Sequence, residues 1–219
     1  MERRRAAPVR IWRNAVSGLR ARQKEDRRNR IVAAAKTLFR QQGFEKTTIE
    51  GIAEAAGLSG VTVHNYYGTK AGVLLALVIE SDKLLIEKLE DSLPATPDSL
   101  TDLVLQFAGD VMDHAIANLD KVIWRQVIAA VTTGGVTHLT RGYFKLDQQL
   151  AFVLVRRIEQ LQQEGKLSAE IDATHLGKAL FHLQNARFIQ FISSDELSRA
   201  DIEQRLRNDL AALFAVGTA

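Results

Sequence analysis

The chain has 219 residues, of which 46% are hydrophobic, and a formal net charge of +3 at pH 7. It contains no cysteine, which excludes disulfides, thiol catalysis and zinc–thiolate sites. Three prolines and few alternating apolar runs favour an all-α protein. No apolar run is long enough to span a membrane, and no signal-peptide core follows the basic N-terminus. We therefore expect a cytoplasmic protein that does not enter the membrane.

The small net charge conceals an uneven distribution. Residues 1–30 hold ten arginines and one lysine against three acidic residues, a net charge of +8, and the rest of the chain carries −5. A basic arm on a mildly acidic body is typical of a nucleic-acid-binding protein, whose affinity falls as the salt concentration rises. Residues 1–22, interrupted by Pro8 and Gly18, form a basic extension that does not read as part of a compact core. Three interpretations of it stay open: a disordered tail, an arm in the DNA minor groove, or a helix on a membrane surface.

Residues 23–69 are predicted to form three helices. In the first, apolar residues recur at helical spacing until Gly43 ends the pattern. In the second, Thr47 is expected to be the N-cap, with Glu50 reaching back to complete a capping box. Gly57 is expected to end that helix, because glycine adopts the left-handed backbone conformation without a steric penalty. The apolar residues of the first helix are Ile31, Ala34, Ala35, Leu38 and Phe39.

The third helix, residues 60–67, is expected to follow at once, with Ser59 as its N-cap and Gly68 at its end. Two short helices joined by a glycine-containing turn are the pattern of a helix-turn-helix, whose second helix enters the major groove of DNA. The same pattern also fits a small helical hairpin with a polar outer face. Side chains able to contact bases or phosphates are Thr62, His64, Asn65, Tyr66 and Lys70.

Residues 30–77 closely resemble the DNA-binding domain of the TetR family of bacterial transcriptional repressors. The resemblance is carried by LFRQQGFEKTT, then IAEAAGLS, then VTVHNYYGTK. It implies that Thr48 contacts phosphate and that Lys70 anchors the following helix to the DNA backbone. Two features depart from the family pattern: His64 stands where tyrosine is usual, and the acidic pair that usually follows the lysine is absent. The recognition-helix positions that the resemblance implies are Gly60, Val61, Thr62, His64, Asn65 and Tyr66.

Residues 70–219 are predicted to form a second, larger helical domain, which brings the total to about nine helices. Each predicted helix carries an apolar stripe at helical spacing. The segment TTGGVTHLTRG is expected to be a loop, and without a preceding strand or a Lys-Ser/Thr ending it is not a phosphate-binding loop. The expected helices are residues 70–92, 98–118, 120–132, 143–164, 172–192 and 198–214.

Neither a metal site nor a catalytic site is expected. Asp110, Asp113 and His114 lie close together in the sequence, but such residues more often form a solvated helix edge than a metal site. No arrangement of a nucleophile with its acid and base partners is recognisable. We therefore predict no cofactor, no metal and no enzymatic activity.

The second domain is rich in aromatic and aliphatic side chains. For any single one, a place in the core is the simpler interpretation, but a mainly apolar cavity with a few polar groups is also how small-molecule sites are built. By resemblance to the family, we expect this domain to bind a small, mainly apolar effector and to form a homodimer through residues 172–192 and 198–214. Candidate cavity residues are Phe107, Val111, Trp124, Val127, Ile128, Tyr143, Phe144, Phe181 and Gln184.

The expected protein is therefore a transcriptional repressor with an N-terminal three-helix DNA-binding domain and a C-terminal ligand-binding and dimerisation domain. As a homodimer it would place two recognition helices about 34 Å apart, in successive major grooves of a palindromic operator in double-stranded DNA. A small-molecule effector would release it, although a corepressor fits the sequence equally well. The alternative is a DNA-binding homodimer without a small-molecule ligand, controlled by its concentration or by a protein partner.

Overall fold

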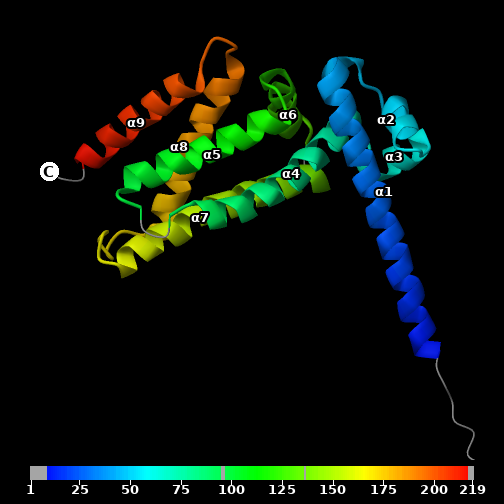
Figure 1. Ribbon diagram of the computed structural model, residues 1–219, viewed down its shortest axis with the longest axis horizontal. Coiled ribbons are helices and arrows are strands. Elements are labelled where there is room, and N and C mark those ends of the chain that lie inside the picture. The colour runs from blue at the N-terminus through cyan, green and yellow to red at the C-terminus, as the bar shows by residue number, and fades with distance from the viewer. Residues whose placement is uncertain (1–8, 95–96, 136, 217–219) are drawn as a thin grey trace, which may run out of the picture. The chain divides into compact units, whose positions relative to one another are not determined.

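The computed structural model describes residues 9–94, 97–135 and 137–216. Within these ranges the chain forms nine helices and no strand, so the all-α fold class is confirmed (Figure 1). The chain divides into two compact units at the Val73–Leu74 bond, inside the fourth helix. No helix in the described ranges is both long and apolar enough to cross a membrane. The helices are α1 (Val9–Lys46), α2 (Ile49–Ala55), α3 (Gly60–Tyr67), α4 (Lys70–Ser92), α5 (Leu100–Asn118), α6 (Lys121–Thr133), α7 (His138–Gln163), α8 (Ala173–Ser193) and α9 (Arg199–Val216).

α1 begins earlier than its apolar pattern predicts. The periodicity starts at Ile31, whereas the helix runs from Val9 and so includes most of the basic extension; residues 1–8 lie outside the described part. All side chains from residue 18 to residue 30 are exposed, so this part of α1 has no apolar stripe from which to predict it. Its Arg, Ala, Gln, Lys and Glu residues have high helix propensity, which accounts for the helix. Gly43, with φ 79°, ends the regular part of α1 at the expected residue.

The first unit has a small apolar core between α1, α2 and α3. Ile31, Ala35 and Phe39 lie one turn apart on α1 and are fully buried. Ile52 of α2 and Val63 of α3 are equally buried, and α2 packs against both other helices. This core fixes the orientation of α3 relative to α1.

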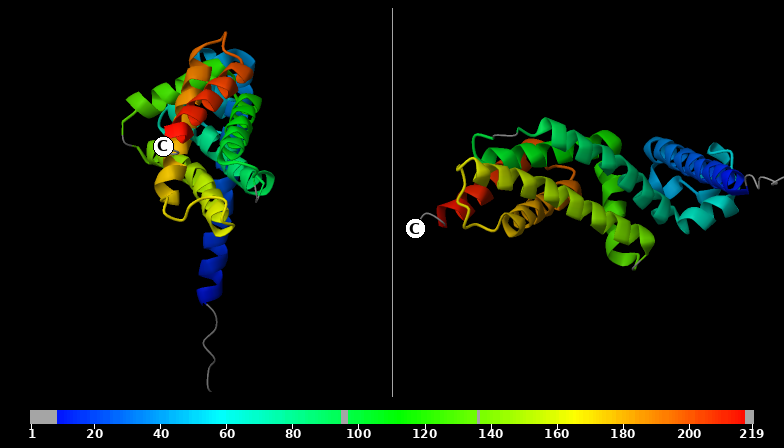
Figure 2. Two further views of the ribbon diagram at one scale, coloured as in Figure 1. Left: turned by 90° about the vertical axis from the view of Figure 1, so that its left-hand side faces the viewer. Right: turned by 90° about the horizontal axis from the view of Figure 1, so that it is seen from below.

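In the second unit, α8 contacts four other helices: α5, α6, α7 and α9. Figure 2 shows this group of helices in two further views. The core that holds them together is aliphatic, with one pair of aromatic rings, Phe107 and Phe181, whose centroids lie 6.4 Å apart. Its fully buried members include Leu89, Leu103, Val104, Leu154, Ile158, Leu206 and Leu210.

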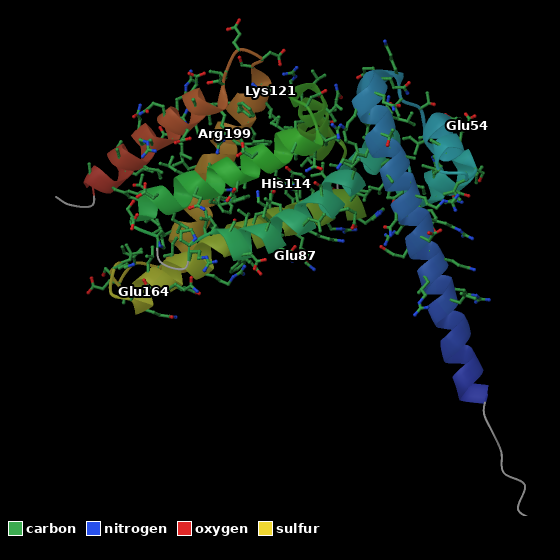
Figure 3. The ribbon with its side chains drawn as sticks, viewed as in Figure 1. Glu54, Glu87, His114, Lys121, Glu164 and Arg199 are labelled. Atoms are coloured by element: carbon green, nitrogen blue, oxygen red, sulfur yellow. The ribbon has the colours of Figure 1, made fainter. Side chains whose placement is uncertain are left out.

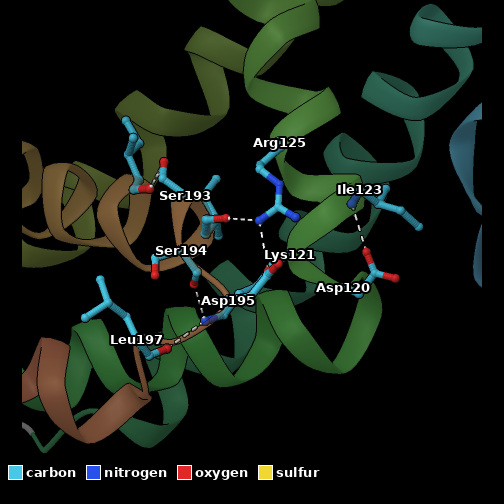
Figure 4. A network of polar contacts seen from close by, with 10 residues as sticks. Asp120, Lys121, Ile123, Arg125, Ser193, Ser194, Asp195 and Leu197 are labelled. Atoms are coloured by element: carbon cyan, nitrogen blue, oxygen red, sulfur yellow. Dashed lines mark hydrogen bonds and ion pairs between the residues drawn. The ribbon is translucent and has the colours of Figure 1, made fainter.

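A polar network joins the start of α6 to the end of α8 (Figure 4). Lys121 Nζ donates to the carbonyl oxygens of Ser194, at 2.9 Å, and Leu197, at 2.7 Å. Arg125 Nη1 donates to the carbonyl oxygen of Ile192 at 2.7 Å. Carbonyls at the C-terminal end of a helix have no partner within the helix, and cations are favoured there. The two basic residues of α6 therefore hold the end of α8 in place.

α7 begins at His138, inside the segment that was expected to be a loop, so that prediction is wrong for its second half. The Thr137 and Thr140 side chains cap the helix reciprocally: each hydroxyl oxygen accepts from the backbone N–H of the other, at 3.1 and 2.8 Å. At Gly142, a Cβ atom would lie 3.0 Å from Cδ1 of Ile79 on α4. The glycine and threonine content of this segment therefore reflects helix capping and close packing.

α7 and α8 approach each other closely at Gly177. A Cβ atom there would lie 2.9 Å from both the backbone nitrogen and the Cα atom of Val155. We expect Gly177→Ala to lower the free energy of unfolding by about 1–3 kcal/mol, because the helices must move apart, as measured by urea denaturation. The matched control is Gly18→Ala on α1, where a Cβ atom would meet nothing within 4 Å. Its effect should be neutral or slightly stabilising, and equal destabilisation of both variants would contradict the packing argument.

Candidate nucleic-acid interface and buried cavity

α3 is bounded by the residues that the sequence predicts. Ser59 Oγ accepts from the backbone N–H of Thr62 at 3.2 Å and forms the N-cap. Gly57 and Gly68, before and after the helix, have φ values of 62° and 72°, a conformation that glycine adopts without strain. The expected caps at both ends of α3 are confirmed.

The N-cap of α2 is Thr48, so the prediction of Thr47 is wrong. Thr48 Oγ1 accepts from the backbone N–H of Gly51 at 3.0 Å. Thr47 is buried instead, and its hydroxyl donates to the carbonyl oxygen of Gly43 at 2.8 Å. The break at Gly43 leaves a carbonyl without a helical partner, and Thr47 satisfies it. The cap moves by one residue, and Gly51 takes the position from which Glu50 was expected to complete the capping box.

α3 buries one face and exposes the other. Val63 and Tyr67, four residues apart, point into the core of the first unit. Val61, His64 and Asn65 are exposed, and their spacing of three and four residues places them together on the opposite face. The exposed face therefore offers methyl groups, an imidazole and a carboxamide, which suit contacts with thymine methyls and with base edges. At the margins, Gly60, Thr62 and Tyr66 are half-buried.

Lys70 makes contacts within the first unit. Its Nζ donates to the carbonyl oxygens of Phe44, at 2.6 Å, and Glu45, at 3.2 Å, and lies 4.3 Å from the centroid of the Phe44 ring. Lys70 thus fastens the first turn of α4 to the end of α1, a role that the sequence did not predict. Thr48 is exposed at the N-terminus of α2, and its hydroxyl proton is available to a phosphate because its oxygen is the acceptor in the cap.

Arg30 of α1 holds the turn between α2 and α3. Its guanidinium donates to the carbonyl oxygens of Ala56 and Gly57. A Cβ atom at Gly57 would lie 2.7 Å from Arg30 Nη2, the far end of a flexible side chain, so the positive φ is the stronger reason for glycine at this position. The arginine therefore stabilises the C-terminal end of α2.

The exposed part of α1 carries several basic side chains. Arg20, Arg22, Lys24 and Arg27 are exposed side chains of one continuous helix. Arg28 is also exposed, with its guanidinium 3.8 Å from the carboxylate of Glu25. An exposed basic helix next to a helix-turn-helix can follow a phosphate backbone without reading bases.

The second unit contains a small cavity of about 30 Å³. It is lined by α4, α5, α6, α7 and α8, and five of the expected cavity residues contribute: Val111, Trp124, Tyr143, Phe181 and Gln184. A wider cavity of about 680 Å³ adjoins it between α7 and α8 and includes the expected Phe144. The two share three lining residues, Asp147, Phe181 and Asn185. Phe107 and Val127 are instead core residues, and Ile128 is half-buried on α6.

Two acidic residues that the sequence did not single out line the small cavity. Asp82 of α4 is only 8% exposed, and its burial, with the nearby charge of Asp147, raises its pKa to about 7. Burial also raises the pKa of Asp147 on α7 to about 7. Tyr143 lines the same cavity, and burial together with these carboxylates raises its pKa well above the ordinary value. Asp82 and Asp147 are 65 residues apart in the sequence, so no local pattern predicts that they line the same cavity.

Two further polar side chains complete this region. Gln184 is 1% exposed, and its Oε1 atom has no hydrogen-bond partner among the described residues. His114, labelled in Figure 3, projects from α5, with its Nε2 atom 2.9 Å from Ser81 Oγ and 3.7 Å from Asp82 Oδ1. An unpaired buried carbonyl is costly, so Gln184 is the kind of group that a ligand or a bound water satisfies.

The acidic residues near His114 do not converge on one point. Asp110 pairs with Lys88 at 3.6 Å, and Asp113 pairs with Arg199 of α9, also labelled in Figure 3, at 3.0 Å. Across the described ranges there is no group of three or more His, Asp or Glu side chains that could hold a metal ion. These residues form contacts between helices.

Comparison with known proteins identifies the first unit. A family model described as bacterial regulatory proteins of the TetR family matches residues 31–77. The transcriptional regulator HbdR of Aromatoleum sp. (strain CIB) is 34% identical over 100 residues, which is 46% of this chain and 37% of that protein. The regulator TcmR of Streptomyces glaucescens is 28% identical over 145 residues, 64% of each protein. The chain thus matches less than two thirds of the length of either relative.

The complete fold is also shared with a solved structure. Thermus thermophilus FadR, a TetR-family transcriptional repressor in complex with lauroyl-CoA, superposes with a TM-score of 0.65 at 21% identity. The superposition covers 85% of this chain and 93% of that one. Its agreement extends over both units, beyond the segment that the family model matches. The segment at residues 31–77 thus matches the TetR family model, and the fold resembles that of a TetR-family transcriptional repressor.

Proposed function

We propose that this chain is a homodimeric transcriptional repressor that binds a palindromic operator through α3 and responds to a small molecule bound in its second unit. The observation that carries the proposal is the exposed face of α3. Val61, His64 and Asn65 lie together on it, while Val63 and Tyr67 fix the helix from the inside. A short helix presented in this way fits the major groove.

Base and phosphate contacts can be assigned to different side chains. Asn65 can bond both N6 and N7 of an adenine, His64 can donate to or accept from a base edge, and Val61 can pack on a thymine methyl. Thr48 and the basic residues of α1 suit phosphates, which position the protein without specifying sequence. Lys70 already donates two hydrogen bonds within the unit, which leaves one of its three donors for a phosphate.

The proposed dimer uses α8 and α9. Arg187 of α8 and Asp209 of α9 form a two-pronged ion pair, with both nitrogen–oxygen distances 2.6 Å, which fixes the two helices as one surface. Ile189 and Leu213 remain 38% and 55% exposed on these helices, and burying such apolar area is the main driving force of association. A second copy related by a two-fold axis would cover the same patch.

The proposed coupling between ligand and DNA runs through α4. This helix carries both Lys70, fastened to the end of α1, and Asp82, in the wall of the cavity. The two residues are twelve positions apart in the same helix. A ligand that shifts α4 at Asp82 would therefore also displace Lys70 and the end of α1 to which it is bonded. Such coupling is typically worth about 1–3 kcal/mol of operator affinity.

The proposal is tested by selecting bound DNA from a random pool with the full chain. We expect a palindromic sequence whose half-sites are about one helical turn apart, bound by two chains as measured by sedimentation. Selection of no sequence, or of a single half-site bound by one chain, would contradict it. If the operator is found but no metabolite in a thermal-shift panel changes operator affinity, the regulator without a small-molecule ligand is the better description.

The exposed basic side chains of α1 provide a separate prediction. We expect the triple variant Arg20→Gln, Arg22→Gln and Lys24→Gln to weaken operator binding. The slope of log affinity against log salt should become shallower by about 0.9 for each phosphate that the variant no longer neutralises. Three exposed lysines of the second unit, Lys83, Lys145 and Lys166, provide a charge-matched control when replaced with glutamine. Equal slopes for the two triple variants would show that α1 does not contact the backbone.

A further inference from the structure

We propose that the effector is a protonated organic amine with an aromatic or aliphatic body, its ammonium group held between Asp82, Asp147 and the Oε1 atom of Gln184. This inference rests on the proposed function, because it names the chemical class of the effector. It also narrows the expectation of a mainly apolar molecule by adding a charged head group.

The head-group site combines two carboxyl groups with an amide carbonyl. Asp82, Asp147 and Gln184 line one cavity of about 30 Å³, roughly the volume that one water molecule occupies in the liquid, and an ammonium group is of similar size. The Gln184 carbonyl is fully buried and has no partner within the described part of the chain. An ammonium group supplies three donors and a positive charge. It therefore satisfies all three side chains at once.

The wider cavity next to this site suits the body of such a ligand. Its volume of about 680 Å³ lies in the range of small-molecule sites, and Phe144, Phe152 and Phe181 line it. Because it shares Asp147 and Phe181 with the small cavity, one molecule can place its head in the first and its body in the second. Aromatic faces also attract a cation, which adds to the preference for an amine.

The neighbouring charges define the competing possibility. Lys178 and His182 of α8 line the wider cavity, and Lys178 Nζ lies 5.3 Å from the centroid of the Phe152 ring. A carboxylate ligand could pair with Lys178 at this outer rim. The inner end of the site has the opposite character, since Asp82, Asp147 and the phenol of Tyr143 surround it. His114 faces Asp82 from α5, but its Nε2 atom, 2.9 Å from Ser81 Oγ, is beyond hydrogen-bonding distance of the carboxylate.

Binding of a cation to this site should depend on pH in one direction. Burial raises the pKa of Asp82 and of Asp147 to about 7, so each holds its proton in much of the free protein at neutral pH. A bound ammonium favours the ionised carboxylates and displaces these protons. Amine affinity should therefore rise as the pH increases through about 7, by at least about tenfold between about pH 5.5 and about pH 8.

The test uses three molecules that share a phenyl ring on a four-carbon chain and differ in the terminal polar group: phenylbutylamine, phenylbutanol and phenylbutyrate. Each is titrated into the full chain, and binding is measured by calorimetry and by the shift in melting temperature. We expect the amine to bind most tightly, with the pH dependence above, and the alcohol to bind at least about tenfold more weakly at about pH 8. Tighter binding of phenylbutyrate, or equal binding of amine and alcohol, would overturn the proposal.

Variants locate the site. Asp147→Asn and Gln184→Met should each weaken amine binding at least about tenfold and leave binding of the alcohol nearly unchanged. Asp147→Asn should also remove part of the pH dependence, which separates the carboxylates from His114 and His182. Glu87→Gln, at an exposed position of α4, is the control and should bind like the parent protein. Amine binding that survives in both cavity variants would also overturn the assignment.

The regulatory role is tested separately with the selected operator. If the amine binds at Asp147 and changes operator affinity, both proposals are supported. If it binds there and operator affinity stays the same, the amine site stands and the proposed ligand-responsive function fails. If it does not bind, the choice of effector class fails, and operator binding still decides the DNA-binding function.

Discussion

Replacing His64 and Asn65 together with alanine is expected to lower operator affinity by about 10²–10⁴-fold. A good base contact contributes about 1–3 kcal/mol of discrimination, and a two-fold dimer makes each contact in both half-sites. A total reduction of about 3–5 kcal/mol corresponds to the fold-change given. Competition between the selected operator and unrelated DNA of the same length measures this effect, because non-specific binding should remain.

The same double variant should keep the stability of the parent protein. His64 and Asn65 are exposed, whereas Val63 and Tyr67 hold α3 to the core. Exposed positions away from caps change stability by about 0.5 kcal/mol or less. Urea unfolding of parent and variant should therefore coincide within that margin.

Lys70→Met is the contrasting variant. It leaves the carbonyl oxygens of Phe44 and Glu45 without the donor that they now have. We expect the free energy of unfolding to fall by about 1.5–3 kcal/mol, because the donor is charged. If the substitutions at His64 and Asn65 lower stability while Lys70→Met does not, the assignment would be wrong. In that case the exposed face of α3 would not be reserved for DNA, and Lys70 would not stabilise the fold.

Asp82→Asn is expected to stabilise the protein by about 2–4 kcal/mol at about pH 8, the largest change in stability that the structure predicts. The pKa of Asp82 rises from the ordinary 3.8 to about 7 in the folded protein, chiefly because burial disfavours the charged carboxylate. Each pKa unit corresponds to about 1.4 kcal/mol. Asparagine has nearly the same shape and carries no charge, so the variant avoids the cost of burying one.

The sign of the pH dependence follows from proton binding. Between about pH 4 and about pH 7 the unfolded chain loses the Asp82 proton while the folded chain keeps it. The stability of the parent protein should therefore fall as pH rises through this window and then level off. Because Asp147 has a similarly raised pKa, the single variant should remove part of this slope. Parent and variant should be nearly equal in stability at about pH 4 and differ most above about pH 7.

Urea denaturation at several pH values measures both quantities. Glu87→Gln removes a carboxylate from an exposed position of the same helix and should leave the stability profile unchanged. A loss of stability in Asp82→Asn at about pH 8 would show that the ionised carboxylate is stabilised by a partner in the folded protein. If the amine proposal is correct, this more stable variant should also bind phenylbutylamine more weakly. The buried carboxylate would then lower the stability of the free protein and strengthen ligand binding.

Local signals explain why α3 was predictable and the start of α1 was not. Ser59, Gly57 and Gly68 act within a few residues of the helix that they bound, so a reading of the sequence finds them. The first part of α1 is helical by propensity alone and exposes every described side chain, so hydrophobic periodicity gives no sign of it. Thr47 shows a third case. Its hydroxyl donates to the carbonyl oxygen of Gly43, and this local hydrogen bond at the break in α1 leaves the cap to Thr48.

The cavity shows where sequence reasoning stops. Five of its aromatic, aliphatic and amide residues could be proposed because an apolar stripe marks the inner side of each helix. Asp82 and Asp147 look like ordinary polar positions of amphipathic helices. Only the packing of α4 against its neighbours brings both residues to the same small cavity. Their importance depends on burial, which neither residue's sequence neighbours reveal.

The position of α3 between Gly57 and Gly68 affects which of its residues can be substituted. The core contacts α3 through Val63 and Tyr67, and Ser59, Gly57 and Gly68 define its ends. The exposed positions of α3 can then be substituted with little effect on folding, so the residues that would contact DNA can change while the rest of the domain stays the same. Libraries randomised at Val61, His64 and Asn65 should yield many folded variants with new sequence preferences. If the proposed function is correct, a few substitutions could in the same way direct the protein to other promoters.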